Sequence, residues 1–306
     1  MIRLGIDLGG SKIEIVALAA DGQERFRRRV PTPQEGYAPV LDAIAALVAA
    51  ADAAVGERGS IGIGTPGSVS RATGLLRGSN SICLNGQAIG PDLERCLGRK
   101  IRITNDANCF ALSEATDGAG AGAETVFGVI LGTGVGAGIV VRGRVLIGPN
   151  AIAGEWGHNP MPWPEPDERP GPACFCGLSG CIEMFLSGPG LEREHLLGTG
   201  TSLGAREIAA RAAAGDSSCE ASLQHYERRL ARALAHVINI LDPDVVVLGG
   251  GLSNMSRLYD RVPRLWGDWV FSDRVDTRLV AHRHGDSSGV RGAAWLWDET
   301  GHDGEG

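Results

Sequence analysis

Two glycine-rich turns, each directly after a short, mainly apolar run, constrain the fold of this chain more than any other feature. The first turn covers residues 9–12 and follows the run Leu4–Leu8 near the start of the sequence. The second covers residues 132–134 and follows the run Val129–Leu131. Because glycine lacks a Cβ, backbone N–H groups in such a turn can gather around an anion. Two such turns in one chain predict a duplicated half-domain that grips a polyphosphate from both sides.

The first turn carries groups that suit a nucleotide. The N–H groups of Gly9, Gly10 and Ser11 would face phosphate oxygens, and Lys12 would add a positive charge. Asp7, at the end of the preceding strand, would hold Mg²⁺ through water, because Mg²⁺ keeps most of its hydration shell. A plain hairpin explains this turn equally well, but the second turn favours phosphate, and a third glycine run would approach the nucleoside. These two further runs are Gly132, Thr133, Gly134 and Gly249, Gly250, Gly251.

Length and charge limit the class of protein. The chain has 306 residues and a net charge of -7, enough length for one large or two medium domains. An acidic chain lacks the basic face of a general nucleic-acid or membrane-surface binder. Met1 leads straight into the first expected strand, and the longest uncharged apolar stretch, residues 125–141, is too short to span a bilayer. We therefore expect a cytoplasmic protein with no membrane or nucleic-acid partner.

Strands and helices alternate along the chain, which predicts an α/β fold. The expected strands are a hairpin over 2–18 and the runs 25–30, 61–64, 100–104 and 245–248. The expected helices are 37–55, one opening at 105–108, 223–241 and a closing helix over 290–297. The glycine-rich segment 117–122 is the expected domain boundary, and the proline-rich segment 160–172 is expected to be an exposed loop.

A cluster of cysteines predicts a metal site. Cys174, Cys176 and Cys181 lie within eight residues, and His158 lies shortly before them. Three thiolates and one imidazole suit tetrahedral Zn²⁺, and a closed set of four ligands leaves no position for a reactive water. The site would therefore be structural. The alternative is a chance grouping of reduced cysteines, and the remaining histidines show no comparable clustering.

Carboxylates at three places are candidates for substrate chemistry. Asp106, beside Asn105, lies where a strand passes into a helix and would take a proton from an attacking hydroxyl, although an Asp there is more often a helix cap. Glu155 and His158 share the motif 154–158, and Glu183 follows the last cysteine of the cluster. Carboxylates accept hydrogen bonds from several hydroxyls, which suits a sugar, but solvated surface glutamates explain the pattern about as well.

Taken together, these residues resemble the ROK family of sugar kinases and sugar-responsive repressors. The resemblance is carried by the motifs at 6–12, 105–108, 132–134, 154–158, 174–183 and 248–251, and it covers residues 2 to about 297. The stretches 154–163 and 284–297 look most like bacterial fructokinases and manno(fructo)kinases of that family. Ser11 stands where the family often has threonine, which keeps the hydroxyl.

The resemblance implies an actin-like, ribonuclease-H-like fold in which ATP and a hexose meet in a cleft between two α/β domains. The smaller N-terminal domain would cover residues 1–117 and 289–300, and the larger domain, with the zinc loop, residues 118–288; residues 301–306 would be a disordered tail. By the same resemblance Asp106 is the catalytic base. The sugar would be held by Asn105, Asp106, Glu155, His158 and Glu183, and the zinc by His158, Cys174, Cys176 and Cys181.

The expected activity is ATP-dependent phosphorylation of the C6 hydroxyl of fructose, and of mannose. The alternative enzymes are a glucokinase or an N-acetylhexosamine kinase of the same family, which residue chemistry alone does not separate. A sugar-responsive DNA-binding regulator is the alternative outside enzymes. It is disfavoured by the acidic charge and by the single residue ahead of Ile2, too few for a DNA-binding helix pair. The resemblance also implies a homodimer.

Overall fold

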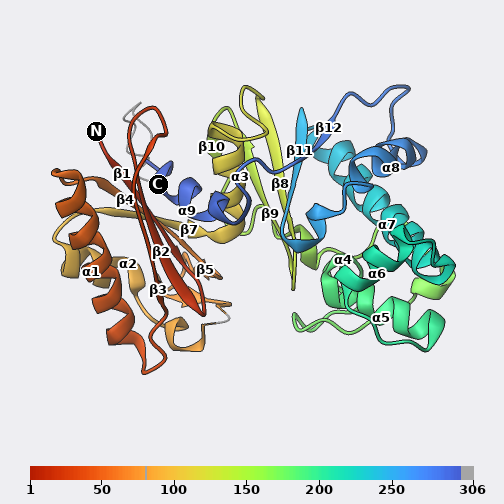
Figure 1. Cartoon of the computed structure of the whole chain (residues 1–306), viewed down its shortest axis with the longest axis horizontal. Coiled ribbons are helices and arrows are strands. Elements are labelled where there is room, and N and C mark those ends of the chain that lie inside the picture. Colours follow the sequence, from red (N-terminus) through yellow and green to blue (C-terminus); the bar gives the residue numbers. More distant parts are fainter. Residues whose placement is uncertain (80, 298–306) are drawn as a thin grey trace.

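The computed structural model describes residues 1–79 and 81–297, which form two five-stranded sheets with helices around and between them (Figure 1). The predicted tail, 301–306, and residues 298–300 lie outside this described part. The first sheet holds the N-terminal strands and the second holds strands from the later half of the chain. The helices α3 (Asp106–Thr116) and α9 (Ser288–Ala294) lie between the two sheets.

The first sheet has the order β3-β2-β1-β4-β7. Strands β1 (Arg3–Leu8), β2 (Lys12–Leu18) and β3 (Glu24–Pro31) form an antiparallel meander, and β4 (Ser60–Thr65) and β7 (Ile101–Asn105) extend it in parallel with β1. Helices α1 (Tyr37–Val55) and α2 (Ile89–Leu97) accompany it, with a short ribbon of β5 (Ser68–Val69) and β6 (Leu76–Arg77) and a 3₁₀ turn, Ile82–Leu84. The central strands β1 and β4 are nearly all buried, because helices cover both faces of the sheet.

The second sheet repeats this topology with the order β10-β9-β8-β11-β12. Strands β8 (Thr125–Leu131), β9 (Val135–Val141) and β10 (Arg144–Val145) are antiparallel, and β11 (Val245–Gly249) and β12 (Arg278–Ala281) run parallel to β8. Strand β8 therefore corresponds to β1, and the second glycine turn joins β8 to β9 as the first joins β1 to β2. The duplicated half-domain that the two turns predict is present in the structure.

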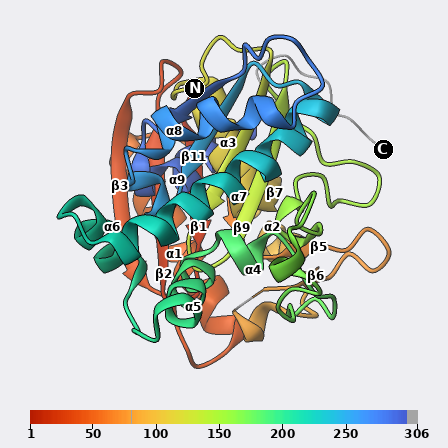
Figure 2. The ribbon, with the colours of Figure 1, turned by 90° about the vertical axis from the view of Figure 1, so that its right-hand side faces the viewer.

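The helices of the later half lie on the outer side of the second sheet, where α7 (Ser217–Leu241) runs across the front of the view in Figure 2. It is accompanied by α4 (Glu183–Leu186), α5 (Gly188–Thr199), α6 (Ala205–Ala213) and α8 (Leu258–Leu265). Short 3₁₀ turns cover Trp156–His158, Pro166–Glu168, Gly251–Asn254, Trp266–Asp268 and Gly285–Ser287. Helix α7 begins well before the expected residue 223, because Asp216 caps it by accepting the N–H groups of Ser218 and Cys219.

Helices α3 and α9 each pack against the sheet that belongs to the other half of the chain. Helix α3 follows β7 of the first sheet but packs against β8 and β9 of the second, while α9 follows β12 of the second sheet and packs against β1, β2 and β4 of the first. The predicted domain boundary at residue 117 therefore groups α3 with the first sheet, whereas its packing joins it to the second. Its alanine-rich sequence carries no local sign of which sheet it will cover.

Backbone-to-backbone contacts fix this crossing. A Cβ placed on Gly292 of α9 would lie 1.7 Å from the carbonyl oxygen of Cys109 in α3. In the same way, a Cβ on Gly5 of β1 would lie 2.0 Å from the carbonyl oxygen of Val290. No side chain fits at such separations, so glycine lets the two helices and the first sheet approach one another at backbone distance.

Helix α1 is apolar enough, by length and composition, to match a membrane-spanning segment, with a mean hydropathy of 1.8. In the structure its stripe of buried residues packs against the first sheet; these are Val40, Ile44, Leu47, Val48 and Ala51. Its exposed positions are alanines and Asp42. The high hydropathy therefore reflects an alanine-rich surface on a helix whose larger apolar side chains cover the sheet.

The segment 160–172 is not the wholly exposed loop expected from its prolines. Met161 and Glu168 are buried, and the Glu168 carboxylate accepts hydrogen bonds from Arg229 at 2.7 Å and Arg232 at 2.5 Å, both from α7. Two guanidinium groups satisfy a carboxylate that would otherwise be costly to bury. The expectation failed because the partners of Glu168 lie more than sixty residues away in the sequence.

The glycine contact at the helix crossing leads to a stability prediction. We expect Gly292→Ala to destabilise the protein by about 3 kcal/mol, because the added methyl group meets the α3 backbone, which cannot move aside. The matched control is Gly90→Ala in α2, where a Cβ would meet no atom within 4 Å. That change should be neutral or stabilise by up to about 1 kcal/mol. Urea unfolding measures both, and equal midpoints for the two variants would contradict the account.

Candidate active site

The junction between β7 and α3 presents Asp106 at the start of a helix. The Asn105 side-chain oxygen accepts the N–H of Asn108 at 2.8 Å and so caps α3. Asp106 is the first helical residue, and its Oδ1 accepts the N–H of Ala107 at 2.8 Å. Of the two interpretations of Asp106, cap or reactive carboxylate, the structure assigns the cap to Asn105.

Asp7 and Asp106 line one cavity of about 520 Å³ between the two sheets. Asp7 comes from the end of β1 in the first sheet, and Asp106 from the helix that packs on the second. Phe110 of α3 also lines the cavity, and the remaining residues come from the ends of β8, β11 and β12, the 3₁₀ turns after β11 and β12, and the start of α9; they are Ile130, Gly250, Gly251, Asn254, His282, Gly285, Ser288 and Gly289. The cavity thus collects the carboxyl ends of parallel strands from both sheets, the usual place for ligands in such folds.

The two carboxylates influence each other electrostatically. The pKa of Asp7 is raised from 3.8 to about 6, mainly by burial and also by the negative charge of Asp106, while Lys12 opposes the rise. Burial also raises the pKa of Asp106, against the hydrogen bond from Ala107, even though the side chain keeps contact with solvent on the cavity side. Two carboxylates that repel each other in one cavity fit a divalent cation, which would relieve the repulsion.

A second cavity, of about 850 Å³, continues from the first. Both cavities include Gly251 and Asn254 in their walls. The second is also lined by Gly132 and Thr133 of the second glycine turn, and by Leu252 and Met255 on its apolar side. Its size and mixed lining suit a nucleoside, with the phosphates directed towards Asp7 and Asp106.

Both glycine turns close their hairpins by backbone hydrogen bonds. The N–H of Gly9 donates to the carbonyl of Lys12 at 2.9 Å, and the N–H of Gly132 donates to the carbonyl of Gly134 at 3.0 Å. Gly10 and Ser11 are exposed at the tip of the first turn, three and four residues after Asp7. In the third run, Gly250 and Gly251 line the cavities, whereas Gly249 is buried in β11 and faces the ring of Phe110. Gly249 therefore leaves room for the Phe110 ring of α3 to pack against β11, and it does not face a ligand site.

The start of β9 brings together the segments that carry the expected sugar ligands. Glu183 accepts the N–H of Val135 at 2.8 Å. The segment that holds Glu155 and His158 packs against β9 at backbone distance, because a Cβ on Gly157 would lie 2.1 Å from the Val135 carbonyl oxygen. Helix α3 lies against the same strand, with Ala107 in van der Waals reach of Gly136. Three separate segments thus meet on the first residues of one strand, next to Asp106.

Asn105 lines a separate, smaller cavity of about 230 Å³. This cavity lies between the ends of β4 and β7 on one side and the loop at Ile147 and Ala151 on the other. The strand-to-helix junction at 105–106 therefore lies between two cavities. Asn105 lines the smaller one, and Asp106 lines the one that adjoins the nucleotide-sized cavity. A fourth and larger cavity, of about 1050 Å³, lies at the opposite ends of β8 and β11, and none of the predicted site residues lines it.

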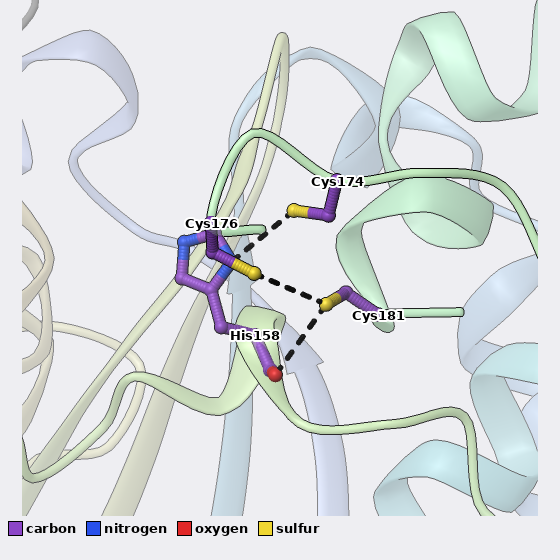
Figure 3. A group of neighbouring side chains, drawn as sticks. All are labelled: His158, Cys174, Cys176 and Cys181. Atoms are coloured by element: carbon purple, nitrogen blue, oxygen red, sulfur yellow. Dashed lines mark hydrogen bonds between the residues drawn. The ribbon is translucent and has the colours of Figure 1, made fainter. Parts of the chain in front are cut away.

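His158, Cys174, Cys176 and Cys181 converge on one point, as Figure 3 shows. Their ligand atoms all lie within 4.8 Å of one another. The Sγ of Cys174 lies 3.6 Å from Nδ1 of His158, and the Sγ atoms of Cys176 and Cys181 are 3.6 Å apart. Zinc bonds of about 2.3 Å to sulfur and 2.0 Å to nitrogen in a tetrahedron put ligand atoms roughly 3.5–3.8 Å apart, so the donor set fits Zn²⁺ in both chemistry and spacing.

A family model described as the ROK family matches residues 3–300 of this chain. The chain belongs to the ROK family. An N-acetyl-D-glucosamine kinase of Yersinia enterocolitica is 40% identical to this ROK protein over 296 residues, covering 95% of the chain and 98% of the relative. The solved ROK hexokinase of Thermus thermophilus superposes with a TM-score of 0.86 at 33% identity and covers 97% of both chains.

A solved ROK family glucokinase of Streptomyces griseus, in complex with glucose and AMPPNP, superposes with a TM-score of 0.75 at 29% identity and covers 97% of this chain and 99% of that one. These relatives confirm the family and the actin-like α/β fold expected from the motifs. The closer likeness to fructokinases is not established by them, since the curated relative reported above carries the name of an N-acetylglucosamine kinase.

Sequence reasoning missed several residues that line the cavity of Asp7 and Asp106. Asn254, His282 and Ser288 all face it, and none stands in a motif with a recognisable spacing. His282 lies directly after β12, so a strand assignment at 278–281 would have placed it at the same sheet edge as the third glycine run. That strand is short and partly exposed, which leaves no alternating pattern to detect.

The raised pKa of Asp7 predicts how stability depends on pH. An unfolded Asp ionises near pH 3.8, whereas folded Asp7 holds its proton up to about pH 6. Stability therefore falls as pH rises from about 4 to 6, and above pH 6 the full cost of the buried charge remains. We expect Asp7→Asn, without nucleotide or metal, to raise the free energy of unfolding by about 2 kcal/mol at pH 7.5. The gain should vanish near pH 4; urea unfolding at both values tests this, and a gain independent of pH would contradict it.

Proposed function

We propose that this ROK protein is an ATP-dependent kinase that transfers a phosphoryl group to the C6 hydroxyl of an N-acetylhexosamine. The observation that carries the proposal is the pairing of Asp7 and Asp106 in a cavity that opens into a nucleotide-sized space. One carboxylate from each half of the molecule faces the place where a terminal phosphate would lie. The complex of the Streptomyces griseus relative with glucose and AMPPNP supports ATP and a sugar as co-substrates.

In this proposal Asp106 orients the sugar hydroxyl and accepts its proton as the hydroxyl attacks the γ-phosphate. Its raised pKa makes it a stronger base than an ordinary carboxylate, and the capping by Asn105 leaves it free for this role. Asp7 would hold Mg²⁺, which when bound offsets negative charge on the phosphates. The turns at Gly9–Lys12 and Gly132–Gly134 would contribute backbone N–H groups to the phosphates, so that positioning and electrostatics supply most of the rate.

The sugar would bind beside the start of β9. Asn105, Glu155, His158 and Glu183 would accept or donate hydrogen bonds to its hydroxyls, held by the segments that meet on this strand. N-acetylglucosamine is preferred over fructose because a relative 40% identical across nearly the whole chain is named as its kinase. The alternative considered from the sequence therefore has more support than the fructose and mannose expected first.

We further propose that the four donors of Figure 3 bind a structural Zn²⁺. The metal would hold the loop 174–181 against His158, and through it the motif that carries Glu155. The loop before the cysteines is held independently by Glu168 and its two arginines. A cytoplasmic location and a homodimer, both expected from the sequence, remain part of this proposal.

Replacing the proposed base should slow phosphoryl transfer strongly without abolishing sugar binding. We expect Asp106→Asn to lower kcat by ~10²–10⁴-fold, because asparagine cannot accept the proton. Sugar affinity, measured by calorimetry, should stay within a few fold of the parent. Asp42→Asn on the exposed face of α1 is the control and should leave kcat unchanged. Turnover of Asp106→Asn at the parent rate would exclude Asp106 as the base.

A substrate panel tests the identity of the sugar. In a coupled ADP-release assay, we expect kcat/KM for N-acetylglucosamine to exceed that for glucose, mannose and fructose by at least about tenfold, since a site that pairs with an acetamido group discriminates against its absence. A preference for fructose would instead support the fructokinase expectation. Negligible turnover of all four sugars would contradict kinase activity on these hexoses.

Zinc content tests the metal site. We expect about one zinc per chain in protein prepared without chelator, and Cys181→Ser should lose both the metal and thermal stability, because the site closes only with four ligands. Cys96→Ser, at an exposed cysteine of α2 outside the cluster, should keep the zinc. Elemental analysis below about half an equivalent in the parent would contradict the site.

A further inference from the structure

His282 lines the cavity of Asp7 and Asp106 and has no role in the proposed reaction. It is the first residue after β12, and its N–H donates to the carbonyl of Leu248 in β11 at 3.0 Å. This backbone bond holds it at the same sheet edge as Gly250 and Gly251, and Gly251 lines both this cavity and the nucleotide-sized one. His282 therefore lines the cavity that adjoins the nucleotide-sized space, and not the separate, smaller cavity that Asn105 lines.

One nitrogen of the His282 ring is already engaged. The N–H of Gly285 donates to Nδ1 at 2.9 Å, so Nδ1 acts as an acceptor and the ring proton belongs on Nε2. Among the described residues, Nε2 has no hydrogen-bond partner. The backbone thus selects the tautomer with an unused N–H donor next to the cavity.

The other polar side chains of this wall are engaged, wholly or in part, by the protein itself. The Ser288 hydroxyl donates to Glu114 at 2.8 Å, and the Asn254 amide donates to the Gly251 carbonyl at 3.1 Å. Asp7 and Asp106 are acceptors when ionised and cannot donate to phosphate oxygens. A phosphate in this cavity needs donors, and His282 and the second amide hydrogen of Asn254 are the donors that remain among the described lining side chains.

The segment after His282 is rigidly held. Glu114, fully buried in α3, accepts hydrogen bonds from the N–H groups of Arg283 at 2.9 Å and His284 at 3.3 Å, and from Ser288. The Ala119 N–H donates to the same carboxylate at 2.9 Å. A donor on such a segment loses little conformational freedom when it binds a ligand, which favours a ligand contact over a surface role.

We propose that His282 is a further nucleotide-binding residue, whose Nε2–H donates a hydrogen bond to the β- or γ-phosphate of ATP. The proposal rests on the proposed kinase function and adds a side-chain contact to its phosphate site. The ring recognises phosphates beyond the α-position, since the cavity of Asp7 and Asp106 lies past the nucleoside space. It takes no part in proton transfer, which stays with Asp106.

Binding measurements with three nucleotides test the contact independently of catalysis. Calorimetry with AMPPNP, ADP and AMP in the presence of Mg²⁺ measures the affinities. We expect His282→Phe to lower the affinity by at least about tenfold, as for loss of a hydrogen bond to a charged group. The loss should affect AMPPNP alone if the contact is to the γ-phosphate, and both AMPPNP and ADP if it is to the β-phosphate. AMP affinity should change less than about twofold. His282→Gln, which keeps an N–H donor, should recover part of the loss.

The control is His225→Phe, at an exposed position of α7, which should bind all three nucleotides like the parent. Equal weakening of AMP, or no weakening of AMPPNP and ADP, would overturn the proposal. Thermal unfolding of each variant separates a lost contact from a lost fold, and His282→Gln carries the test if the phenylalanine variant does not fold. If the parent protein binds AMPPNP but phosphorylates no sugar, the proposed kinase function is wrong, and the contact of His282 can still be tested by binding.

Discussion

The crossing of α3 and α9 at backbone distance is the constraint on which the active site depends. Helix α3 starts at Asp106 and α9 starts at Ser288, beside Asp7, so the two helices present their first residues to the same cavity. Gly292 allows the crossing, and Glu114 ties the end of α3 to the segment that leads into α9. A carboxylate from each half of the chain lines the same cavity because this contact leaves the halves little freedom to slide apart.

Much of the fold could be predicted from the sequence, because local chemistry determines it. Each glycine turn follows an apolar run, and both hairpins form where these patterns place them. Helix α1 runs over the predicted residues because its apolar stripe and the Gly56 cap mark its limits. The side exchange of α3 and α9 could not be predicted in this way. It depends on which sheet each helix packs against, and the alanines and glycines of both helices suit either one.

In the candidate site, too, some residues could be predicted from the sequence and others depend on the fold. The proposed base, Asp106, and the proposed zinc donors stand in motifs whose residue types and spacing suggest the chemistry. The structure places Asp106 in a cavity and brings the four donor atoms within 4.8 Å of one another. His282 escaped notice because its role comes from strand register and from a backbone bond to Gly285, neither of which leaves a pattern in the sequence. Glu168 illustrates the reverse error, since a proline-rich, acidic segment suggested solvent where two distant arginines provide a buried partner.

The glycine at the helix crossing has a mechanical consequence. Carbonyl and Cα atoms meet there without intervening side chains, so if the two sheets tilt relative to one another, the crossing would be the fulcrum of that motion. Atoms near a fulcrum travel little while those at the far rim travel most. Asp7, at the end of β1, and Asp106, at the start of α3, lie near the crossing and would keep their separation as the halves tilt. The distal loops, including that of Ile147, would sweep the longer arc over the substrate.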